Sequence, residues 1–253
     1  MIYVLRTAFV AAMIAVSSAA TADSAAPGAV RNIVLVHGAN TDGSVWRGVY
    51  DMLKKDGYHV SIVQEPLTGL ADDVAATERV IDRQDGPVIL VGHSYGGTII
   101  TVAGVDPKVR ALVYVAALQP DVGESTSRLA ASMPGKVPGS DLQPTKDGFI
   151  FIDPGKFAVD VGTDLSARQA DFMANAQMPV AAAAFDAPVT VAAWHDKPSY
   201  GIIATGDRAL NPELAHWMYK RSGAKTTEVK GNHLFFVSKP ATVAKVIETA
   251  AAQ

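Results

Sequence analysis

Short runs of apolar residues recur along the chain, separated by longer stretches in which apolar and polar positions are mixed. The run at residues 32–36 is almost continuously apolar, which is typical of a strand buried on both faces of a parallel sheet. We predict six strands in all, over residues 32–36, 59–63, 87–91, 109–117, 200–205 and 226–229.

The stretches between these strands favour helices. We predict helices over residues 44–55, with Ser44 as N-cap, over 71–85, after the glycine-rich segment at 92–97, over 211–221, and from Pro240 onwards. Strands that alternate with helices indicate a parallel sheet covered on both faces, and right-handed crossovers make it doubly wound. The predicted fold class is therefore α/β, with a mainly parallel six-stranded sheet.

Residues 119–198 break this alternation. They carry several proline–glycine turn signals, a short β-like piece at 149–152 and a helical stretch from 166 towards 177. An insertion this long after the fourth strand is too large for a plain loop. We predict a cap over 119–198, folded over the sheet edge where open α/β proteins bind ligands. The core then comprises residues 31–118 and 199–253.

The first residues have the pattern of an export signal. Arg6 precedes a run of apolar and small residues over 7–20, and Ala20-Thr21-Ala22 offers an A-x-A cleavage site. A frayed N-terminal helix is the alternative. We predict a signal peptide over 1–22 and a linker over 23–30, and expect an exported protein, periplasmic or secreted. The run is too short to span a bilayer, so we expect no stable membrane span in the mature protein.

Composition narrows the classes of function. With 253 residues, 49% hydrophobic and 19% charged, the chain suits one globular α/β domain. A formal net charge of -3 without a basic stripe gives no electrostatic case for binding nucleic acid. The absence of cysteine excludes a thiol nucleophile. The sequence has no metal-ligand cluster, phosphate loop or dinucleotide fingerprint, so we expect neither a cofactor nor a metal.

The predicted third strand leads into the clearest chemical motif of the chain. Gly92-x-Ser94-x-Gly96 fits the nucleophile elbow, in which a serine lies on a strained turn between a strand and a helix. A chance match is the alternative. The apolar strand before the motif and the helix-compatible residues after it favour Ser94 as a nucleophile.

A serine hydroxyl is a poor nucleophile unless a base takes its proton and an acid orients that base. His233 lies in a loop directly after the sixth predicted strand, at the same sheet edge as Ser94. It is the predicted base, with a solvated or core histidine as the alternative. His195, at the exit of the cap, is a weaker competitor.

Asp207 follows the fifth predicted strand and precedes His233, and it is the predicted acid. A turn residue or a partner for Arg208 is the alternative role. Asp186 and Asp196 are alternative acids within the cap, less favoured because a cap is the mobile part of such a protein.

The tetrahedral intermediate of acyl transfer needs two amide donors for its oxyanion. One is predicted to be the N–H of Tyr95, directly after the nucleophile. The other should come from the loop after the first strand, where Gly38 allows close approach of the backbone and Ala39 is the predicted donor.

Five segments together resemble the α/β-hydrolase superfamily, and within it the small esterases related to plant methyl-ester esterases and hydroxynitrile lyases. These are residues 35–39 (LVHGA), 42–46 (DGSVW), 70–74 (LADDV), 92–97 (GHSYGG) and 231–233 (GNH). The resemblance implies an α/β-hydrolase fold with Ser94, Asp207 and His233 as a catalytic triad. It also implies Ala39 and Tyr95 as oxyanion donors, and a small-molecule ester as substrate.

Two departures from the lyase branch favour an esterase. Those lyases have a threonine where Gly38 stands and a lysine where Leu234 stands, and both serve cyanide chemistry. Three interpretations stay open: a serine ester hydrolase that works through an acyl-enzyme, an acyltransferase or C–C lyase on the same triad, or a non-catalytic ligand-binding homologue. Apolar cap residues suggest a small, partly apolar ester, although core packing explains them equally well: Phe157, Phe172, Met173, Met178, Phe185 and Trp194.

Overall fold

The computed structural model describes residues 30–253, so the predicted signal peptide and nearly all of the predicted linker lie outside the described residues. Six strands form one sheet in the order β2-β1-β3-β4-β8-β9, and every neighbouring pair is parallel. These strands are β1 (Asn32–Val36), β2 (His59–Ile62), β3 (Val88–His93), β4 (Val109–Val115), β8 (Ser199–Ala204) and β9 (Lys225–Val229). The predicted fold class is confirmed.

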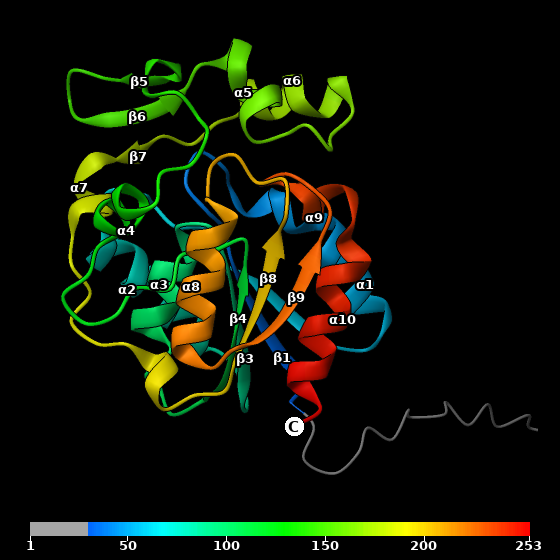
Figure 1. Ribbon diagram of the computed structural model, residues 1–253. Helices are drawn as coiled ribbons and strands as arrows, with labels where there is room; N and C mark the ends of the chain where they lie inside the picture. The colour runs from blue at the N-terminus through cyan, green and yellow to red at the C-terminus, as the bar shows by residue number, and fades with distance from the viewer. Residues whose placement is uncertain (1–29) are drawn as a thin grey trace, which may run out of the picture.

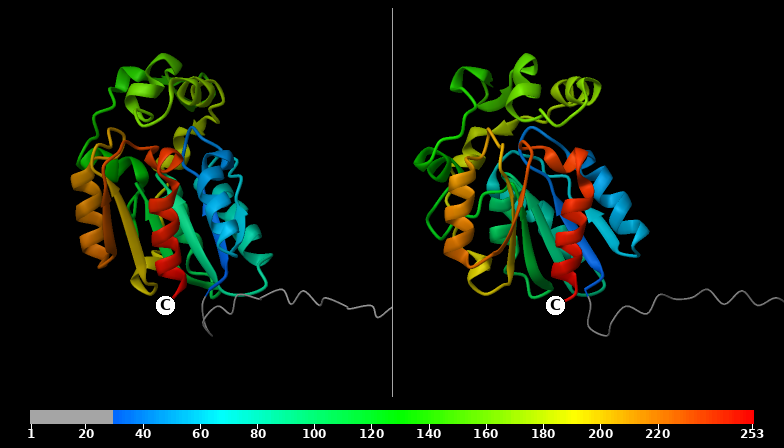
Figure 2. Two further views of the ribbon diagram at one scale, coloured as in Figure 1. Left: turned by 90° about the vertical axis from the view of Figure 1, so that its right-hand side faces the viewer. Right: turned by 45° about the vertical axis from the view of Figure 1, so that its right-hand side comes forward.

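Helices cover both faces of this sheet (Figures 1 and 2). One face packs against α1 (Arg47–Lys55), α9 (Phe235–Ser238) and α10 (Pro240–Ala251), and the other against α2 (Leu70–Asp82), α3 (Gly96–Ala103) and α8 (Pro212–Ser222). Alternate strand residues point to opposite faces, so Ile33 and Leu35 join one apolar cluster and Val34 joins the other. Because β1 is buried on both faces, its sequence is almost continuously apolar.

Helix ends follow the capping signals in part. Asn211 caps α8 by accepting a 3.0 Å hydrogen bond from the Glu213 N–H, at the start of the predicted helix. The predicted N-cap at Ser44 is wrong. Asp42 accepts the Ser44 N–H at 2.6 Å instead and opens the 3₁₀ turn η1 (Gly43–Trp46), which runs into α1.

The chain between β4 and β8 lies over the carboxyl ends of the strands as a cap (Figure 1). Its three-stranded antiparallel sheet has the order β5-β6-β7. The cap elements are α4 (Thr126–Ser132), η2 (Gly139–Asp141), β5 (Leu142–Pro144), β6 (Phe149–Ile152), α5 (Pro154–Asp160), α6 (Ala167–Asn175), β7 (Val180–Ala181), α7 (Ala182–Asp186) and η3 (Ala193–His195).

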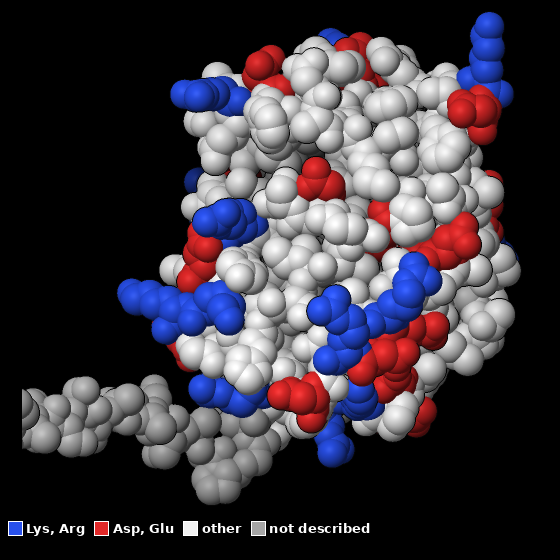
Figure 3. Space-filling view, turned by 180° about the vertical axis from the view of Figure 1, so that it is seen from behind, with Lys and Arg blue, Asp and Glu red and all other residues white. Residues whose placement is uncertain are grey.

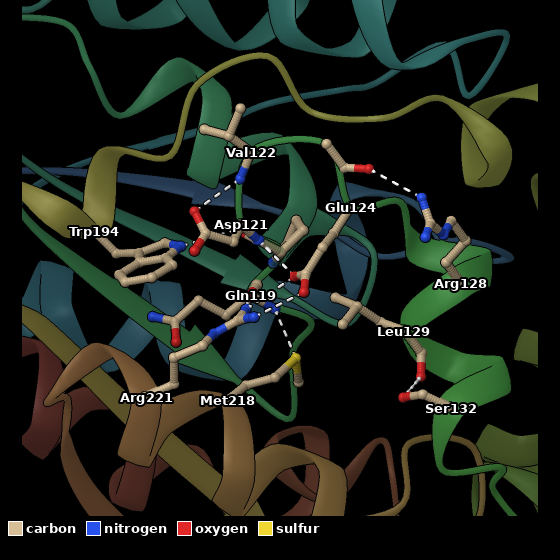
Figure 4. A network of polar contacts seen from close by, with 12 residues as sticks. Gln119, Asp121, Val122, Glu124, Arg128, Leu129, Ser132, Trp194, Met218 and Arg221 are labelled. Carbon is tan, nitrogen blue, oxygen red and sulfur yellow. Dashed lines mark hydrogen bonds and ion pairs between the residues drawn. The ribbon is translucent and has the colours of Figure 1, made fainter.

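Polar contacts join the two ends of the cap insertion to each other and to α8 (Figure 4). Arg221 of α8 pairs with Glu124 through two contacts of 2.8 and 3.0 Å, and it donates to the Gln119 carbonyl at 2.8 Å. The indole N–H of Trp194, near the exit of the cap, donates to the Pro120 carbonyl at 2.8 Å. Hydrogen bonds and an ion pair therefore hold together the two ends of the cap, which we call its stem.

On the face shown in Figure 3, acidic and basic side chains lie side by side over the core and are sparser over the cap. Across residues 30–253, none of the helices combines the length and the apolar character needed to cross a bilayer.

Candidate active site

Ser94 occupies the turn between β3 and α3 with a φ of +53°, a strained value for a residue with a side chain. The glycines on either side make this turn sterically feasible. A Cβ on Gly92 would lie 2.5 Å from the Gly96 carbonyl oxygen, and a Cβ on Gly96 would lie 2.5 Å from the His37 carbonyl oxygen. The spacing of these glycines therefore places a half-buried serine at the end of a buried strand, where it lines the cavity beneath the cap.

Three of the predicted site residues form one hydrogen-bonded chain. Nε2 of His233 lies 2.8 Å from the Ser94 hydroxyl, and its Nδ1 lies 2.7 Å from Oδ2 of Asp207. His233 and Asp207 are both buried. This order of hydroxyl, imidazole and carboxylate fixes the ring so that Nε2 faces the serine.

Asp207 both orients His233 and stabilises its own turn, two roles that the sequence analysis gave as alternatives. Its Oδ1 accepts the N–H groups of Ala209 and Leu210 at 2.8 and 2.9 Å, as a turn residue does, and its Oδ2 is left for His233. The alternative partner Arg208 lies against Asp160 of the cap, with 3.5 Å between Nη2 and Oδ1.

His93 supports the His233 loop, a role that no sequence pattern indicated. Its Nε2 lies 3.2 Å from the His233 carbonyl oxygen, and the two ring centroids are 4.7 Å apart. Complete burial, together with the nearby His233, lowers the pKa of His93 well below its usual value. The neutral ring therefore donates an N–H to the carbonyl without adding a positive charge beside His233.

The cap holds the same loop from the other side. The Asn232 N–H donates to the Asp164 carboxylate, and the Leu234 N–H donates to the Val161 carbonyl at 3.0 Å. Asn232 in turn accepts the His233 N–H at 2.7 Å through its side-chain oxygen. The position of His233 thus depends on cap residues that are distant in sequence, which is why sequence reasoning missed them.

The two predicted oxyanion donors flank Ser94. Across residues 30–253, neither the Ala39 nor the Tyr95 N–H has a hydrogen-bond acceptor in the protein. The loop that carries Ala39 packs directly on the elbow, since a Cβ on Gly38 would lie 2.9 Å from Cβ of Ser94. Both amides are therefore available beside the hydroxyl.

A cavity of about 340 Å³ opens beside Ser94 and His233, between the core and the cap. None of its lining residues is Asp, Glu, Lys or Arg. Of the apolar cap residues singled out in the sequence, Phe157 and Phe185 line it. Phe172 is 66% exposed, and Trp194 is buried in the cap stem. The cavity suits an uncharged, mainly apolar ligand.

The alternative site residues lie elsewhere. Asp186 and Asp196 are exposed and do not line the cavity. His195 contacts Asp121 in the cap stem, with 2.8 Å between Nε2 and Oδ1. Within the part of the chain that the structure describes, no group of three or more His, Asp or Glu side chains is placed to hold a metal ion.

The arrangement around Ser94 suits acyl transfer. A hydroxyl bonded to an oriented imidazole can give up its proton as it attacks a carbonyl carbon, and two free amides can bind the oxyanion that forms. The mainly apolar lining of the cavity lowers the local dielectric constant and so strengthens these electrostatic interactions.

Comparison with known proteins places the chain in a family. A model described as "Alpha/beta hydrolase family" matches residues 33–246. A carbendazim hydrolyzing esterase of Nocardioides sp. (strain SG-4G) is 36% identical over 123 residues, which are 42% of this chain and 49% of that protein. Methylesterase 8 of Arabidopsis thaliana is 28% identical over 134 residues, 45% of this chain and 49% of that protein. The chain therefore spans about half the length of each of these relatives.

The solved structure of polyneuridine aldehyde esterase superposes with a TM-score of 0.73 at 20% identity, covering 86% of this chain and 98% of that one. At this identity the likeness concerns the fold alone. Together with the family match and the methylesterase relative, it confirms the resemblance predicted from the sequence motifs.

Proposed function

Because the chain belongs to the alpha/beta hydrolase family, we propose that it is a serine hydrolase that cleaves carboxylic esters of small, partly apolar substrates. The observation that carries the proposal is the continuous hydrogen-bonded chain from Ser94 through His233 to Asp207, with contacts of 2.8 and 2.7 Å. The esterases among its relatives support the same class of reaction.

In the first half of the reaction, the Ser94 hydroxyl attacks the ester carbonyl carbon while Nε2 of His233 accepts its proton. Asp207 holds the ring and stabilises the imidazolium that forms. The N–H groups of Ala39 and Tyr95 donate to the oxyanion. His233 then gives the proton to the departing alcohol, which leaves Ser94 acylated.

In the second half, His233 takes a proton from water, and the resulting nucleophile attacks the acyl-enzyme. Collapse of the second tetrahedral intermediate releases the carboxylic acid and returns the proton to Ser94. Each oxyanion forms at the same two amides, so one site serves both steps.

The cavity lining supports a neutral substrate. A charged ester would leave its charge in an apolar cavity without a charged partner, which is costly. The volume of about 340 Å³ lies at the small end of ligand cavities. We therefore infer esters whose acyl and alcohol parts are both small and at least one of which is apolar.

The test is a panel of uncharged chromogenic esters of increasing acyl length, assayed with the intact protein and with Ser94→Ala. We expect turnover of the shorter esters by the intact protein and a loss on the order of 10⁴-fold or more in Ser94→Ala. An organophosphonate should label Ser94, and the thermal melt of the variant should be nearly unchanged. Labelling at another serine, or full turnover by Ser94→Ala, would contradict the proposal.

Acyl transfer and C–C cleavage are the alternatives on the same three residues. Adding a competing alcohol to the ester assay separates transfer from hydrolysis, because a transferase yields the new ester in preference to the acid. A cyanohydrin substrate tests the lyase reaction. Inactivity with every one of these substrates, with unlabelled Ser94, would favour a ligand-binding protein.

We further propose that the protein is exported, on the strength of the A-x-A site at Ala20-Thr21-Ala22. The mature chain should then begin near Asp23. Intact-mass measurement of the protein from the culture medium or the periplasm checks this, and a mass that still includes Met1 would refute cleavage.

A further inference from the structure

Two carboxylates, Glu65 and Asp73, lie fully buried behind the elbow, and the proposed mechanism uses neither of them. Both come from the short segment that links β2 to α2 and the first turn of that helix. A buried carboxylate is costly unless it is paired. Each of the two therefore needs a partner. Glu65 contacts His37, two residues before the predicted donor Ala39, and Asp73 contacts the side chain of Tyr95, the other predicted donor.

Glu65 contacts His37 at the end of β1. The Glu65 backbone N–H donates to Nε2 of His37 at 3.2 Å, and Oε2 of the Glu65 carboxylate lies 2.5 Å from the same nitrogen. Burial alone would lower the pKa of His37, but the Glu65 carboxylate outweighs it and raises the pKa above its usual value. Glu65 thus contacts the His37 ring through both its backbone and its carboxylate, and holds the ring next to the loop that carries Ala39.

The other nitrogen of His37 acts on that loop. Nδ1 donates to the Gly38 carbonyl oxygen at 2.9 Å, and the Thr41 hydroxyl donates to the same oxygen at 3.0 Å. The Gly38 carbonyl and the Ala39 N–H belong to one planar trans peptide, so they point in opposite directions. Two donors that fix the carbonyl therefore also fix the direction of the Ala39 N–H.

The Tyr95 amide is fixed differently. Its peptide partner, the Ser94 carbonyl oxygen, accepts the backbone N–H groups of Gly97 and Leu118 at 2.9 and 3.1 Å. Asp73 accepts the Tyr95 hydroxyl at 2.9 Å, at the far end of the side chain. Backbone groups alone therefore fix the Ser94–Tyr95 peptide, whereas side chains fix the Gly38–Ala39 peptide.

We propose that His37, held by Glu65, and Thr41 are positioning residues that aim the Ala39 amide at the oxyanion. This inference rests on the proposed function, because it assigns a task to an amide that only acyl transfer requires. Loss of the donors to the Gly38 carbonyl should weaken binding of the transition state and leave binding of the ester unchanged.

A matched pair of double variants tests this inference. His37→Asn with Glu65→Gln removes the contact between the ring and the carboxylate but keeps a side-chain N–H near the Gly38 carbonyl. His37→Leu with Glu65→Gln has a similar shape and no donor. We expect kcat of the leucine variant to be about ten- to a hundredfold below that of the asparagine variant, with KM within about twofold. A trifluoromethyl ketone, which forms a tetrahedral adduct, should lose affinity by the same factor.

Thr41→Val keeps the test decisive if the double variants do not fold. It removes only the second donor, so kcat should fall severalfold and Thr41→Ser should restore it. Asp73→Asn is the matched control, since it removes the other buried carboxylate of the segment without touching the Gly38 carbonyl. We expect its kcat to stay within about twofold of the intact protein.

Equal kcat and equal ketone affinity in the leucine and asparagine variants, or an unchanged Thr41→Val, would overturn the inference. The proposed function would survive that result if turnover still required Ser94. Conversely, an intact protein that neither turns over esters nor forms the ketone adduct refutes the proposed function itself.

Discussion

The core and the cap contribute to the same cavity in opposite ways. The core supplies polar groups, each fixed by short contacts at the end of a strand: Ser94 after β3, Asp207 after β8 and His233 after β9. The cap supplies apolar walls such as Phe157 and Phe185. Under the proposed function, the groups whose chemistry tolerates little displacement follow strands of the sheet, and the cap walls shape the space for the substrate.

The division between polar core and apolar cap is not complete. The cap carboxylate of Asp164 accepts the N–H of Asn232, directly before His233. The cap is therefore also a brace for the loop that carries the proposed base. Variants on either side of this boundary can measure how complete the division is.

The largest effect is expected for the acid. Asp207→Asn keeps the side-chain shape but can reverse the tautomer of His233, a change that costs about 10⁴-fold in kcat in a serine protease. We expect a comparable loss in ester turnover, with the fold retained by circular dichroism. His233→Ala should be at least as severe.

The two cap aspartates provide the contrast for Asp207. Asp186→Asn and Asp196→Asn should each stay within about tenfold of the intact rate, equivalent to roughly 1.4 kcal/mol of barrier. An inactive cap variant alongside a fully active Asp207→Asn would show that the acid has been assigned to the wrong half of the molecule.

An intermediate effect is expected where the cap braces the loop. Asp164→Ala removes the acceptor of the Asn232 N–H, so His233 should lose part of its fixed position and kcat should fall about tenfold. Steady-state kinetics on one short ester measures this. Asp153→Ala is the control, because Asp153 caps α5 through a 2.8 Å bond to Gly155 and does not touch the loop. If both variants lose kcat equally, the brace has no special role.

A smaller effect is expected at the cap wall. Leu142 lines the cavity while 41% exposed, so Leu142→Ala removes only part of an apolar contact. We expect KM for the longer apolar esters to rise about three- to fivefold, with little change for the shortest ester. Val159→Ala, an exposed cap position outside the cavity, should leave KM unchanged. A uniform fall in kcat for all esters would place Leu142 in the chemistry instead.

The core and the cap also differ in how well the sequence predicts them. The core strands were predicted to within about two residues. The four central strands β1, β3, β4 and β8 are buried and mainly apolar, which makes them easy to recognise. The edge strands β2 and β9 are more polar and more exposed, and their place between helices indicated them. The three residues of the hydrogen-bonded chain follow strand ends, where topology brings them together, and the structure does bring them together; their catalytic roles stay predictions.

The cap was harder to predict because its elements are short and depend on one another. Pro154 and Gly155 signalled a turn, but Asp153 caps them into the first turn of α5. β7 has two residues and exists only through its pairing with β6. Likewise, nothing in the sequence pairs Glu65 with His37, since the contact joins segments that only the fold places side by side.

The smallest effect on activity, and the sharpest on stability, is expected at Asp73, a buried aspartate that lies outside the reaction. Burial raises its pKa to about 6, and Glu65 adds to this, while the Tyr95 hydroxyl, the Leu67 N–H and His37 oppose it. The folded state therefore binds this proton more tightly than the unfolded state. The stability that the proton contributes is complete below about pH 4 and is lost as the pH rises through about 6.

The Asp73→Asn variant has no titrating group at this position, so its stability should not fall for this reason as the pH rises. A shift of about two units corresponds to roughly 3 kcal/mol, or on the order of 6–12 °C in Tm for a domain of this size. The Tm of Asp73→Asn minus that of the intact protein should therefore grow between pH 4 and pH 7 and then level off, while kcat at pH 8 stays within about twofold. Thermal melts of both proteins across this range measure the difference. A constant difference in Tm would mean that Asp73 titrates alike in the folded and unfolded chains. A large fall in kcat would mean that Asp73 takes part in the reaction.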